Sequence, residues 1–522
     1  MDNHDLSSKP IPRFWYFSVF LNFFLLFILF LFLSQTRNVD GDEGLYLEAA
    51  RLVAQGKELY FDFFYQQMPL LPYLYAGWMK IFGFDFFVGR WLSALLTALT
   101  GGIFFFYVAR KTRSLFLMNF CALIFFANGL ILAWAPVVKT HPLSLLGLTS
   151  SAILLLLWRE KQAWWLVALA AVGIGLGVNS RLTLGPFIPI YLIYILLKSR
   201  GHVWRDGVLF ILIVALTSFP TFFYFFSDPQ LFWKYNMLYH TQVYPGVVGG
   251  SRRLSTAQNL FLQAQMILLL LAAQGTILLL IKRNWRKFLD SDESFISLLL
   301  IFFIAIHMAS AEPYTQYFVT MVPLLVMLCV PIFQWIWAKP KILSLPVLLL
   351  FSIFYLGSAR ATMDFEVSSM LSHRPEWSLR NIQKTVQVIE ETLKPGEACL
   401  TWWPGYAFMA GCRTVPGMEN HMRNYGVQKL NQQEMSDYKM LSDEDLFEIL
   451  KEGKYRVLVD GVYHIESPLY KYIREQIQEN YIPAGMGVLV QYDKGWALFD
   501  LVYSEAFERS VRYGKRKRAP RI

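Results

Sequence analysis

Three carboxylates stand within four residues near the start of the chain, in the run Asp40-Gly-Asp-Glu. A carboxylate at the rim of a membrane cavity can act as a general base towards a hydroxyl group or can bind a cation. The apolar residues that follow recur at helical spacing, which predicts an amphipathic helix on a membrane surface, ended by Gly56. These apolar residues are Leu45, Tyr46, Ala49, Leu52 and Val53.

Helix capping is a structural explanation for part of this acidic run. Asp40 and Glu43 are three residues apart, as in a capping box, and the helix dipole favours acidic side chains at an N-terminus. Capping therefore explains Asp40 and Glu43 well. It explains Asp42 less well, because a helix does not need three acidic residues at its start, so Asp42 is the first candidate for chemistry.

The rest of the chain has the composition of a membrane protein. Of its 522 residues, 55% are hydrophobic and only 16% are charged, whereas an average soluble domain has roughly 25% charged residues. Uncharged runs such as 14–33, 91–109 and 257–281 match the roughly 20 residues that cross a bilayer. We therefore expect a polytopic α-helical membrane protein. The first run is too long for a signal-peptide core and no small-residue cleavage site follows it, so we expect it to remain as a transmembrane helix.

Apolar windows predict about eleven spans along the chain. They cover residues 14–33, 87–109, 114–138, 142–158, 163–180, 182–197, 207–227, 257–281, 295–310, 314–338 and 342–358. Residues 68–84 are not counted, because this segment is short, contains Lys80 and two prolines, and would break the alternation of basic loops. We interpret it as an interfacial or re-entrant segment.

Every second connection between these spans is basic. The positive-inside rule places these connections and the N-terminus in the cytoplasm, and the membrane would be the inner membrane in a bacterium. The net charge of +10 is explained by this topology, so we expect no nucleic-acid partner. The basic connections include Lys9 and Arg13; Arg110, Lys111 and Arg113; Arg159 and Lys161; Lys198, Arg200 and Arg205; Lys282, Arg283, Arg286 and Lys287; and Lys339 and Lys341.

The chain changes character after residue 358, and the odd number of spans places this part outside the cytoplasm. Its patterns predict helices at 376–393, 443–451 and 468–480, and strands at 398–403, 455–460, 487–492 and 496–503. The sequence thus divides into a transmembrane module at 1–358, with its first outward loop at 35–86, an extracytoplasmic α/β domain at 359–510 and a basic tail at 511–522. Cys399 and Cys412 could form a disulfide bond in an oxidising compartment, but spacing alone does not establish one and we expect free thiols.

The first outward loop resembles that of a known enzyme family. Asp42 and Glu43 are followed at family-like spacing by five further positions, namely Tyr46, Ala50, Gly56, Tyr60 and Asp62, and then by Pro69-Leu70-x-Pro72-Tyr73. This order is similar to the GT-C glycosyltransferases, with the protein O-mannosyltransferase-like enzymes and the lipid A aminoarabinose transferases as the nearest branches. The resemblance covers the chain to about residue 358. It implies a GT-C fold and the transfer of a sugar, by inverting displacement, from a polyprenyl-phosphate carrier to a glycan, lipid or protein acceptor outside the cytoplasm.

The same resemblance implies roles for individual residues. Asp42 would be the catalytic carboxylate, with Glu43 as its neighbour in the acidic pair. A departing lipid phosphate needs positive charge nearby more than it needs a general acid. Arg181 and Arg90 match basic positions of the family, and both are expected to contact the donor phosphate, although each could instead be an interfacial anchor.

Further residues are expected around the donor and the acceptor. Tyr314 or Tyr317 would border the donor phosphate. The aromatic loop at 228–256, with His240, resembles a lid over donor and acceptor, although an ordinary interfacial aromatic belt is the favoured explanation for its individual aromatic residues. Tyr46 is a further acceptor candidate.

One position departs from the family pattern. Many members have a second acidic residue at the start of the fourth span, where this chain has His141 in the run Val138-Lys-Thr-His. His141 could orient the acceptor, could bind a divalent metal together with Asp42 and Glu43, or could serve only in local capping. The departure weakens a metal site built on two carboxylates, and metal dependence stays open.

A lipid-linked sugar flippase or transporter without chemistry is the alternative function. Transporters usually carry charged residues within their spans and interrupted helices in two related halves. Here the predicted spans are nearly free of acidic residues, whereas acidic residues cluster in one outward loop, which favours an enzyme. The C-terminal domain contains no comparable acidic cluster, so we expect it to contribute acceptor recognition more than chemistry.

Overall fold

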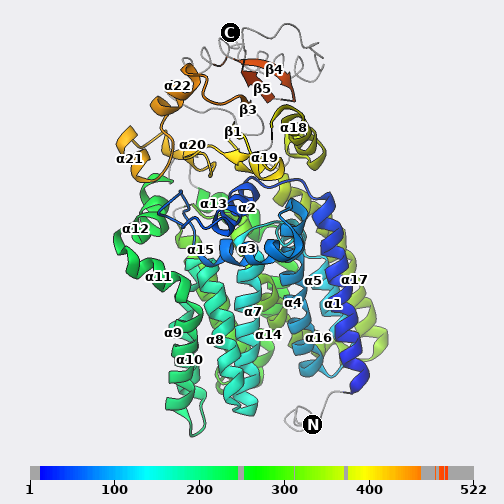
Figure 1. Ribbon diagram of the computed structural model, residues 1–522. Coiled ribbons are helices and arrows are strands. Elements are labelled where there is room, and N and C mark those ends of the chain that lie inside the picture. Colours follow the sequence, from blue (N-terminus) through cyan, green and yellow to red (C-terminus); the bar gives the residue numbers. More distant parts are fainter. Residues whose placement is uncertain are drawn as a thin grey trace, which may run out of the picture.

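A long helical bundle with a small sheet-containing domain at one end makes up the computed structural model (Figure 1). The structure describes residues 12–244, 252–310, 312–368, 374–394, 396–459, 477, 481–486 and 488–491. The bundle is built from α1 (Arg13–Thr36), α4 (Phe86–Thr112), α5 (Leu115–Phe126), α6 (Gly129–Trp134), α7 (Thr140–Lys161), α8 (Trp164–Ser180), α9 (Phe187–Lys198), α10 (Val203–Thr217), α11 (Phe219–Ser227), α14 (Ala264–Leu289), α15 (Asp292–Ala309), α16 (Val322–Trp337) and α17 (Lys341–Ser368).

Each predicted span coincides with helical structure, but not every one is a single long helix. Within the described residues, seven helices are long and apolar enough to cross a membrane, or eight if α10 and α11, which are bent by 64°, count as one span. Shorter apolar helices occupy three further predicted positions, including α5. The predicted span at 114–138 is broken at Asn128, which is the N-cap residue of α6. Its side chain accepts a hydrogen bond from the amide of Ile131. The long helices, the bent pair and the shorter helices thus occupy the predicted positions, and the expected number of about eleven spans stays a prediction.

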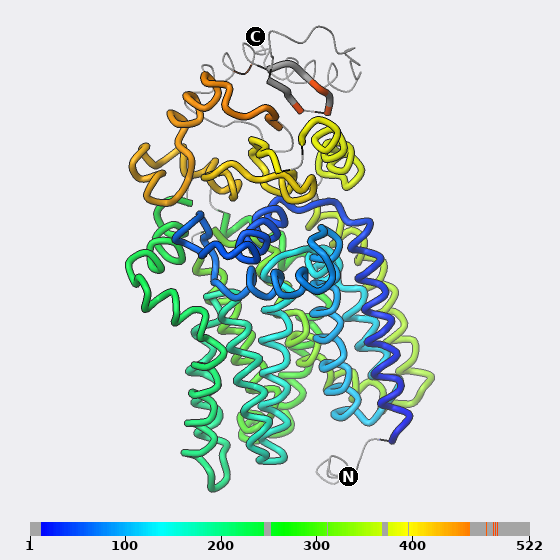
Figure 2. Tube along the Cα trace, viewed as in Figure 1, coloured from blue at the N-terminus to red at the C-terminus, as the bar shows by residue number. Residues whose placement is uncertain are grey.

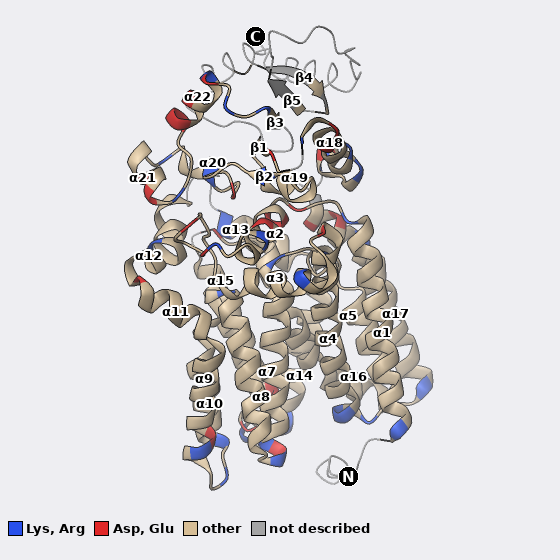
Figure 3. Ribbon diagram, viewed as in Figure 1, with Lys and Arg blue, Asp and Glu red and all other residues tan. Residues whose placement is uncertain are grey.

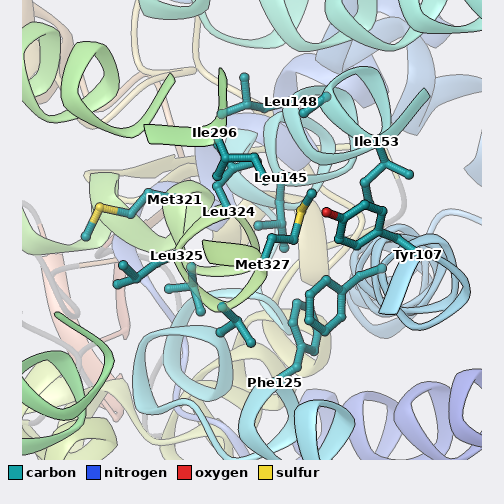
Figure 4. Packing of buried hydrophobic residues seen from close by; sticks show 14 of the residues in the cluster. Tyr107, Phe125, Leu145, Leu148, Ile153, Ile296, Met321, Leu324, Leu325 and Met327 are labelled. Carbon is teal, nitrogen blue, oxygen red and sulfur yellow. The ribbon is translucent and has the colours of Figure 1, made fainter. Parts of the chain in front are cut away.

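The interior of the bundle is apolar and closely packed. Buried side chains from α4, α5, α7, α15 and α16 meet in one cluster, part of which is shown in Figure 4. Among them are Tyr107, Phe125, Leu145, Ile296 and Met327. Interiors of this kind are as dense as organic crystals, so they hold the ends of the helices in fixed relative positions.

Two helices of the first outward loop cover one end of the bundle (Figure 1). They are α2 (Gly41–Ala54) and α3 (Leu70–Phe82), and both are packed against their neighbours. The left-handed backbone at Gly56, with φ of 89°, follows the end of α2, as the sequence predicted. The predicted interfacial segment at 68–84 is α3, which lies across the bundle end instead of running through it. The lid segment at 228–256 contains α12 (Pro229–Trp233), η2 (Lys234–Val243) and the start of α13 (Arg252–Phe261).

The C-terminal domain is a five-stranded sheet with helices, seen at the top of Figure 2 in yellow, orange and red. Its strand order is β2-β1-β3-β5-β4, with β1 parallel to β2 and β3, and with β5 antiparallel to β3 and β4. The strands are β1 (Ala398–Thr401), β2 (Arg413–Thr414), β3 (Val457–Val459), β4 (Tyr481–Gly485) and β5 (Val488–Gln491). The helices are α18 (Leu379–Thr392), α19 (Pro404–Met409), α20 (Arg423–Gly426), α21 (Gln432–Asp437) and α22 (Asp443–Lys451).

The sequence predicted the larger elements of this domain and missed the shorter ones. Strands β1, β3 and β5 and helices α18 and α22 lie where they were predicted. Strands β2 and β4 and the short helices α19, α20 and α21 were not predicted. Most of the predicted helix at 468–480, and all of the strand at 496–503 and the tail at 511–522, lie outside the described residues.

A disulfide bond joins Cys399 to Cys412, which corrects the expectation of two free thiols. The first cysteine lies in β1 and the second directly precedes β2. The parallel pairing of Ala398 with Arg413 brings the two cysteines together, and a pattern of residue types along the chain does not reveal this pairing.

Candidate active site

The acidic run is the N-terminus of α2. Asp40 is the N-cap residue, and its side chain accepts a hydrogen bond from the amide of Asp42 at 3.1 Å. The side chain of Glu43 accepts a hydrogen bond from the backbone amide of Asp40 at 2.9 Å, which completes a capping box. The capping explanation is thus confirmed for Asp40 and Glu43, and Asp42 is left free to point elsewhere.

Glu43 and Arg90 form a fully buried ion pair between α2 and α4. Arg90 Nη2 lies 2.6 Å from Glu43 Oε2, and Arg90 Nε donates to Glu43 Oε1 at 2.7 Å. Glu43 Oε1 also accepts from the amide of Val138, while Arg90 donates further to the carbonyls of Ser34, Arg37 and Asn38. Both groups are occupied by protein partners and neither is exposed. This arrangement differs from the expectation that Arg90 contacts a donor phosphate, because a guanidinium enclosed in this way has no donor left to offer.

Asp42 lies between the side chains of Lys139 and His421, which come from different parts of the chain. Its side chain is 27% exposed, with Oδ2 at 3.0 Å from Lys139 Nζ and Oδ1 at 3.5 Å from His421 Nε2. Burial alone would raise the pKa of this carboxyl group, but the ammonium of Lys139 and the hydrogen bond from His421 hold the pKa of Asp42 well below its usual range. Asp42 is therefore ionised at every physiological pH.

Lys139 was not singled out by the sequence, yet it holds the acidic run together. Its ammonium contacts Asp40 Oδ1 at 2.8 Å and Asp42 Oδ2 at 3.0 Å, and it donates a hydrogen bond to Gln316 Oε1 at 2.7 Å. The ring of Trp134 lies 4.8 Å from the same nitrogen. A lone lysine beside an apolar span normally indicates an interfacial anchor, so its residue type gave no signal of this role.

Arg181 is the second buried cation near the site, and its surroundings differ from those of Arg90. Its side chain stacks on the ring of Tyr317, with 4.0 Å from Cζ to the ring centroid. Arg181 Nη1 donates to Nδ1 of His141 at 2.9 Å, so this ring nitrogen carries no proton. Arg181 is only 9% exposed, and no carboxylate of the described chain forms an ion pair with it.

Close approach of α7 and α8 positions His141 and Arg181. A side chain at Gly147 in α7 would meet the carbonyl of Gly173 at 2.6 Å and the Cα of Gly177 at 2.8 Å, both in α8. Arg181 directly follows α8 with an extended backbone, and His141 lies in the first turn of α7. Glycine at these contacts lets the two helices touch, which brings the end of one to the beginning of the other.

Tyr46 connects the acidic run to the Arg181 cluster. It lies one turn after Asp42 in α2 and is buried. Burial and the carboxylate of Asp42 raise the pKa of Tyr46, whereas the positive charge of Arg181 acts in the opposite direction. The charges of Asp42 and Arg181 therefore both act on the hydroxyl of Tyr46.

The predicted tyrosines extend this cluster towards the lid segment. The rings of Tyr314 and Tyr317 pack edge to face at 5.5 Å, and the hydroxyl of Tyr314 is hydrogen-bonded to that of Tyr244. The guanidinium of Arg252 lies 4.2 Å from the ring centroid of Tyr314 and is paired with Glu312 at 3.0 Å. Tyr317 thus contacts Arg181 directly, and Tyr314 lies one ring further out.

The lid segment and the C-terminal domain meet at Gln66. His240 Nε2 donates to the carbonyl of Gln66 at 2.6 Å, and the side chain of Asn420 donates to Gln66 Oε1 at 2.6 Å. The hydroxyl of Tyr239 donates to the carbonyl of Met422 at 3.0 Å. His240 is therefore linked through Gln66 to Asn420, the residue that directly precedes His421.

The C-terminal domain is packed directly on α2. Trp403 Nε1 donates to the carbonyl of Gly41 at 2.8 Å, and Thr414 donates to Glu48 Oε1 at 2.7 Å. A side chain at Gly44 would lie 2.6 Å from the amide nitrogen of Gly405, so the two parts touch through their backbones. Figure 3 shows acidic and basic residues gathered around α2 and this domain, whereas the middle of the bundle is almost free of charge. His421 reaches Asp42 because of this contact, and nothing in the local sequence indicated it.

The three residues considered for a metal ion do not converge. Glu43 is paired with Arg90 and His141 accepts from Arg181, while Asp42 is bound by Lys139. Across the described residues, no group of three or more His, Cys, Asp and Glu side chains is arranged to hold a metal ion. The donor set around Asp42 does not fit a divalent cation, because an ammonium group already occupies the position between the carboxylates.

Part of the chain matches a known sequence family. Residues 66–225 match the dolichyl-phosphate-mannose-protein mannosyltransferase family. This stretch contains Arg90, Lys139, His141 and Arg181, and it begins after Asp42. No curated protein matches the chain in sequence.

Solved structures show which fold the whole chain adopts. ArnT from Cupriavidus metallidurans bound to undecaprenyl phosphate has a TM-score of 0.63 and 13% identity, covering 91% of this chain and 97% of ArnT. The apo form of the same protein gives 0.62 and 12%, with the same coverage. An oligosaccharyltransferase from Archaeoglobus fulgidus, tethered with an acceptor peptide, gives 0.50 and 11%, covering 94% of this chain and 75% of that protein. The chain has the GT-C fold.

This fold, together with the family match over residues 66–225, agrees with the resemblance of the first outward loop, and the GT-C fold predicted from that loop is confirmed. The chain is an integral membrane protein with a small C-terminal sheet region. The roles of individual residues in this GT-C protein follow from its own geometry and are proposals.

Proposed function

We propose that this GT-C protein transfers a sugar from a polyprenyl-phosphate carrier to an acceptor on the extracytoplasmic side of the membrane, with inversion at the anomeric carbon. Asp42 is the catalytic carboxylate, and Arg181 binds the donor phosphate. The family match to dolichyl-phosphate-mannose-dependent enzymes and the structural likeness to ArnT bound to undecaprenyl phosphate support a lipid-phosphate donor.

One observation carries this proposal: Arg181 is a buried guanidinium without a carboxylate partner among the described residues, located beside the acidic run. Burying a charge without a counter-charge is costly, and proteins tolerate it mainly where a ligand supplies the missing charge. Arg90 shows the contrast, because its charge is fully balanced by Glu43. A lipid phosphate would balance Arg181 in the same way.

Charge development explains why an arginine at this place would accelerate transfer. The donor phosphodiester has one negative charge, and the departing lipid phosphate gains a second as the bond to the anomeric carbon breaks. Arg181 therefore interacts more strongly with the transition state than with the bound donor, which lowers the barrier. Stacking on Tyr317 keeps the guanidinium plane fixed, so no energy is spent on reorienting it during the reaction.

Asp42 suits the role of receiving a hydrogen bond from the acceptor hydroxyl. Its partial exposure leaves room for one more partner, and its low pKa keeps it ionised. A weak base of this kind takes little of the proton in the ground state. It takes more as the sugar carbon becomes electron-deficient and the attacking hydroxyl becomes acidic, so its contribution is largest in the transition state.

The C-terminal domain completes this site in our proposal. The expectation was that it contributes acceptor recognition more than chemistry. Through His421 it also contacts the catalytic carboxylate, so the domain would influence the reaction as well as the choice of acceptor. The basic residues at the opposite end of the bundle, seen in Figure 3, support an extracytoplasmic location for this domain.

Two measurements test the proposed function. Lipid-linked sugars and surface glycans are compared between deletion cells, cells with the wild-type gene and cells with Asp42→Asn. We expect a polyprenyl-phosphate sugar to accumulate, and one glycan modification to disappear, in both the deletion and the variant. If the protein were a flippase, its loss would instead leave the lipid-linked sugar on the cytoplasmic side of the membrane. Normal glycan modification in cells with Asp42→Asn would overturn the assignment of Asp42.

A further inference from the structure

The ammonium of Lys139 occupies the position at which a cation would bind the acidic run. Three oxygen atoms surround it, namely Asp40 Oδ1 at 2.8 Å, Asp42 Oδ2 at 3.0 Å and Gln316 Oε1 at 2.7 Å. An ammonium group has three N–H donors, so the three oxygens saturate it. Carboxylate and amide oxygens are also the ligands that hard divalent cations prefer.

The chain holds this lysine rigidly. Lys139 is the N-cap residue of α7 with an extended backbone, its side chain is almost fully buried, and the ring of Trp134 covers its nitrogen. Asp40 cannot move away, because it is also the N-cap of α2. A divalent ion could reach the two carboxylates only by displacing a buried cation that already neutralises part of their charge.

We propose that Lys139 is the resident cation of this site, and that the protein orients Asp42 with this ammonium group instead of a divalent metal ion. Lys139 is a positioning residue that acts through Asp42. The proposal rests on the proposed function only in treating Asp42 as the catalytic carboxylate, and its claim about metal binding stands separately.

Metal binding by purified protein without any substrate is the first test. Mn²⁺ is titrated into chelator-treated protein and bound ion is followed by electron paramagnetic resonance. We expect wild-type protein to show no binding that depends on Asp42 at concentrations up to about 1 mM, the weak end of oxygen-ligand cation sites. Lys139→Ala frees Asp40 and Asp42, so it should gain one Mn²⁺ site, which Lys139→Ala combined with Asp42→Asn should lose again.

Lys139→Arg and Lys111→Ala are the matched controls. The arginine variant keeps a positive charge between the carboxylates and should bind no Mn²⁺ there. Lys111 is likewise paired with two acidic residues, Asp292 and Glu293, but at the other end of the bundle. Its loss changes the net charge by the same amount and should create no binding that Asp42→Asn removes.

Transfer activity gives the second readout, once a donor is in hand. Chelation should leave the wild-type rate unchanged within twofold, whereas Lys139→Ala should lower kcat/KM at least tenfold and recover part of it with Mn²⁺. Removing the ammonium also raises the pKa of Asp42, so the acidic limb of the pH profile should move to higher pH in Lys139→Ala. A purely structural lysine would move neither the metal response nor this limb.

Two results would overturn the proposal. One is a stoichiometric Mn²⁺ site in wild-type protein that Asp42→Asn abolishes; the other is a wild-type activity that chelation removes and metal restores. If Lys139→Ala does not fold, the wild-type and Lys139→Arg titrations still decide the question. If no lipid-linked sugar is transferred, the proposed function fails, and the titrations report on Lys139 independently.

Discussion

His421 of the C-terminal domain lies 3.5 Å from the carboxylate of Asp42 at the N-terminus of α2, although 379 positions separate the two along the numbered sequence (421 minus 42). The contact exists because Trp403 and Thr414 bind α2 directly, at Gly41 and Glu48. A domain outside the bundle thus completes the surroundings of the proposed catalytic residue.

Replacing His421 tests whether this contact matters for the reaction. His421 contributes to the low pKa of Asp42, so His421→Ala should raise that pKa and shift the acidic limb of kcat/KM to higher pH. We expect a loss of about tenfold in kcat, equivalent to about 1.4 kcal/mol. The control is Lys234→Ala, which removes a contact between the lid segment and Asp437 of the C-terminal domain. This variant should leave the pH profile as it is. Unchanged kcat and an unchanged pH profile in His421→Ala would remove His421 from the site.

Replacing Arg90 and Arg181 by alanine should affect the stability of the protein differently. Arg90→Ala leaves Glu43 buried and unpaired, which typically costs about 3–5 kcal/mol of stability, so thermal unfolding in detergent should shift to lower temperature. Arg181→Ala removes a charge that has no carboxylate partner in the described chain, and it should not lower the unfolding temperature. If Arg181→Ala destabilised the protein as much as Arg90→Ala does, Arg181 would be a structural residue instead of a phosphate ligand.

The disulfide bond between Cys399 and Cys412 should stabilise the C-terminal domain. The bridge closes a loop between cysteines 13 positions apart, for which loop-closure entropy predicts about 3 kcal/mol, a figure that depends on the model for the unfolded chain. Replacing both cysteines by serine should therefore make this domain easier to cleave by protease. Thiol labelling of protein taken directly from cells should find these two cysteines oxidised, as an extracytoplasmic location requires; two reduced thiols would contradict that location.

Glu419, two positions before His421, predicts a dependence of stability on pH. Burial is the main cause that raises its pKa to about 7, while the amide of Gly417 hydrogen-bonds the carboxylate and acts in the opposite direction. The folded state therefore holds a proton that the unfolded state releases at about pH 4.5. Its stabilising contribution is fully present below that pH and is lost as pH rises towards 7. We expect Glu419→Gln to flatten this decline in thermal unfolding measured from pH 5 to 8; an identical slope would show that Glu419 does not titrate in this range.

The sequence predicted the elements of this protein better than its contacts. Apolar windows located the helices, and the Asp42 loop indicated the family, because length, periodicity and helix capping are local properties. Arg90 and Arg181 looked alike in sequence, since both are basic residues at the start of a predicted span. Only the packing of α2 against α4 shows that one of them is neutralised by Glu43 and the other is not.

Lys139 and His421 could not be predicted for a related reason. These residues lie in a loop at 135–139 and in a domain near the end of the chain, and both meet a helix that begins at Gly41. Local sequence patterns do not indicate which distant segments come together in this way. The β1–β2 register that forms the disulfide bond is non-local in the same sense. Each of these features depends on how separate elements pack, and residue type alone does not encode it.

In the proposed mechanism, Asp42 and Arg181 carry out sugar transfer from a lipid phosphate. The most direct measurement is single-turnover transfer by purified protein from the polyprenyl-phosphate sugar that accumulates in deletion cells. Relative to wild type, we predict no detectable transfer by Asp42→Asn, and a rate lower by about 10²–10³-fold for Arg181→Ala, the loss typical of one oxyanion contact. Arg181→Lys should be intermediate, because a lysine restores the charge without the planar fork. Wild-type rates in Asp42→Asn, or equal rates in all three Arg181 proteins, would contradict the account.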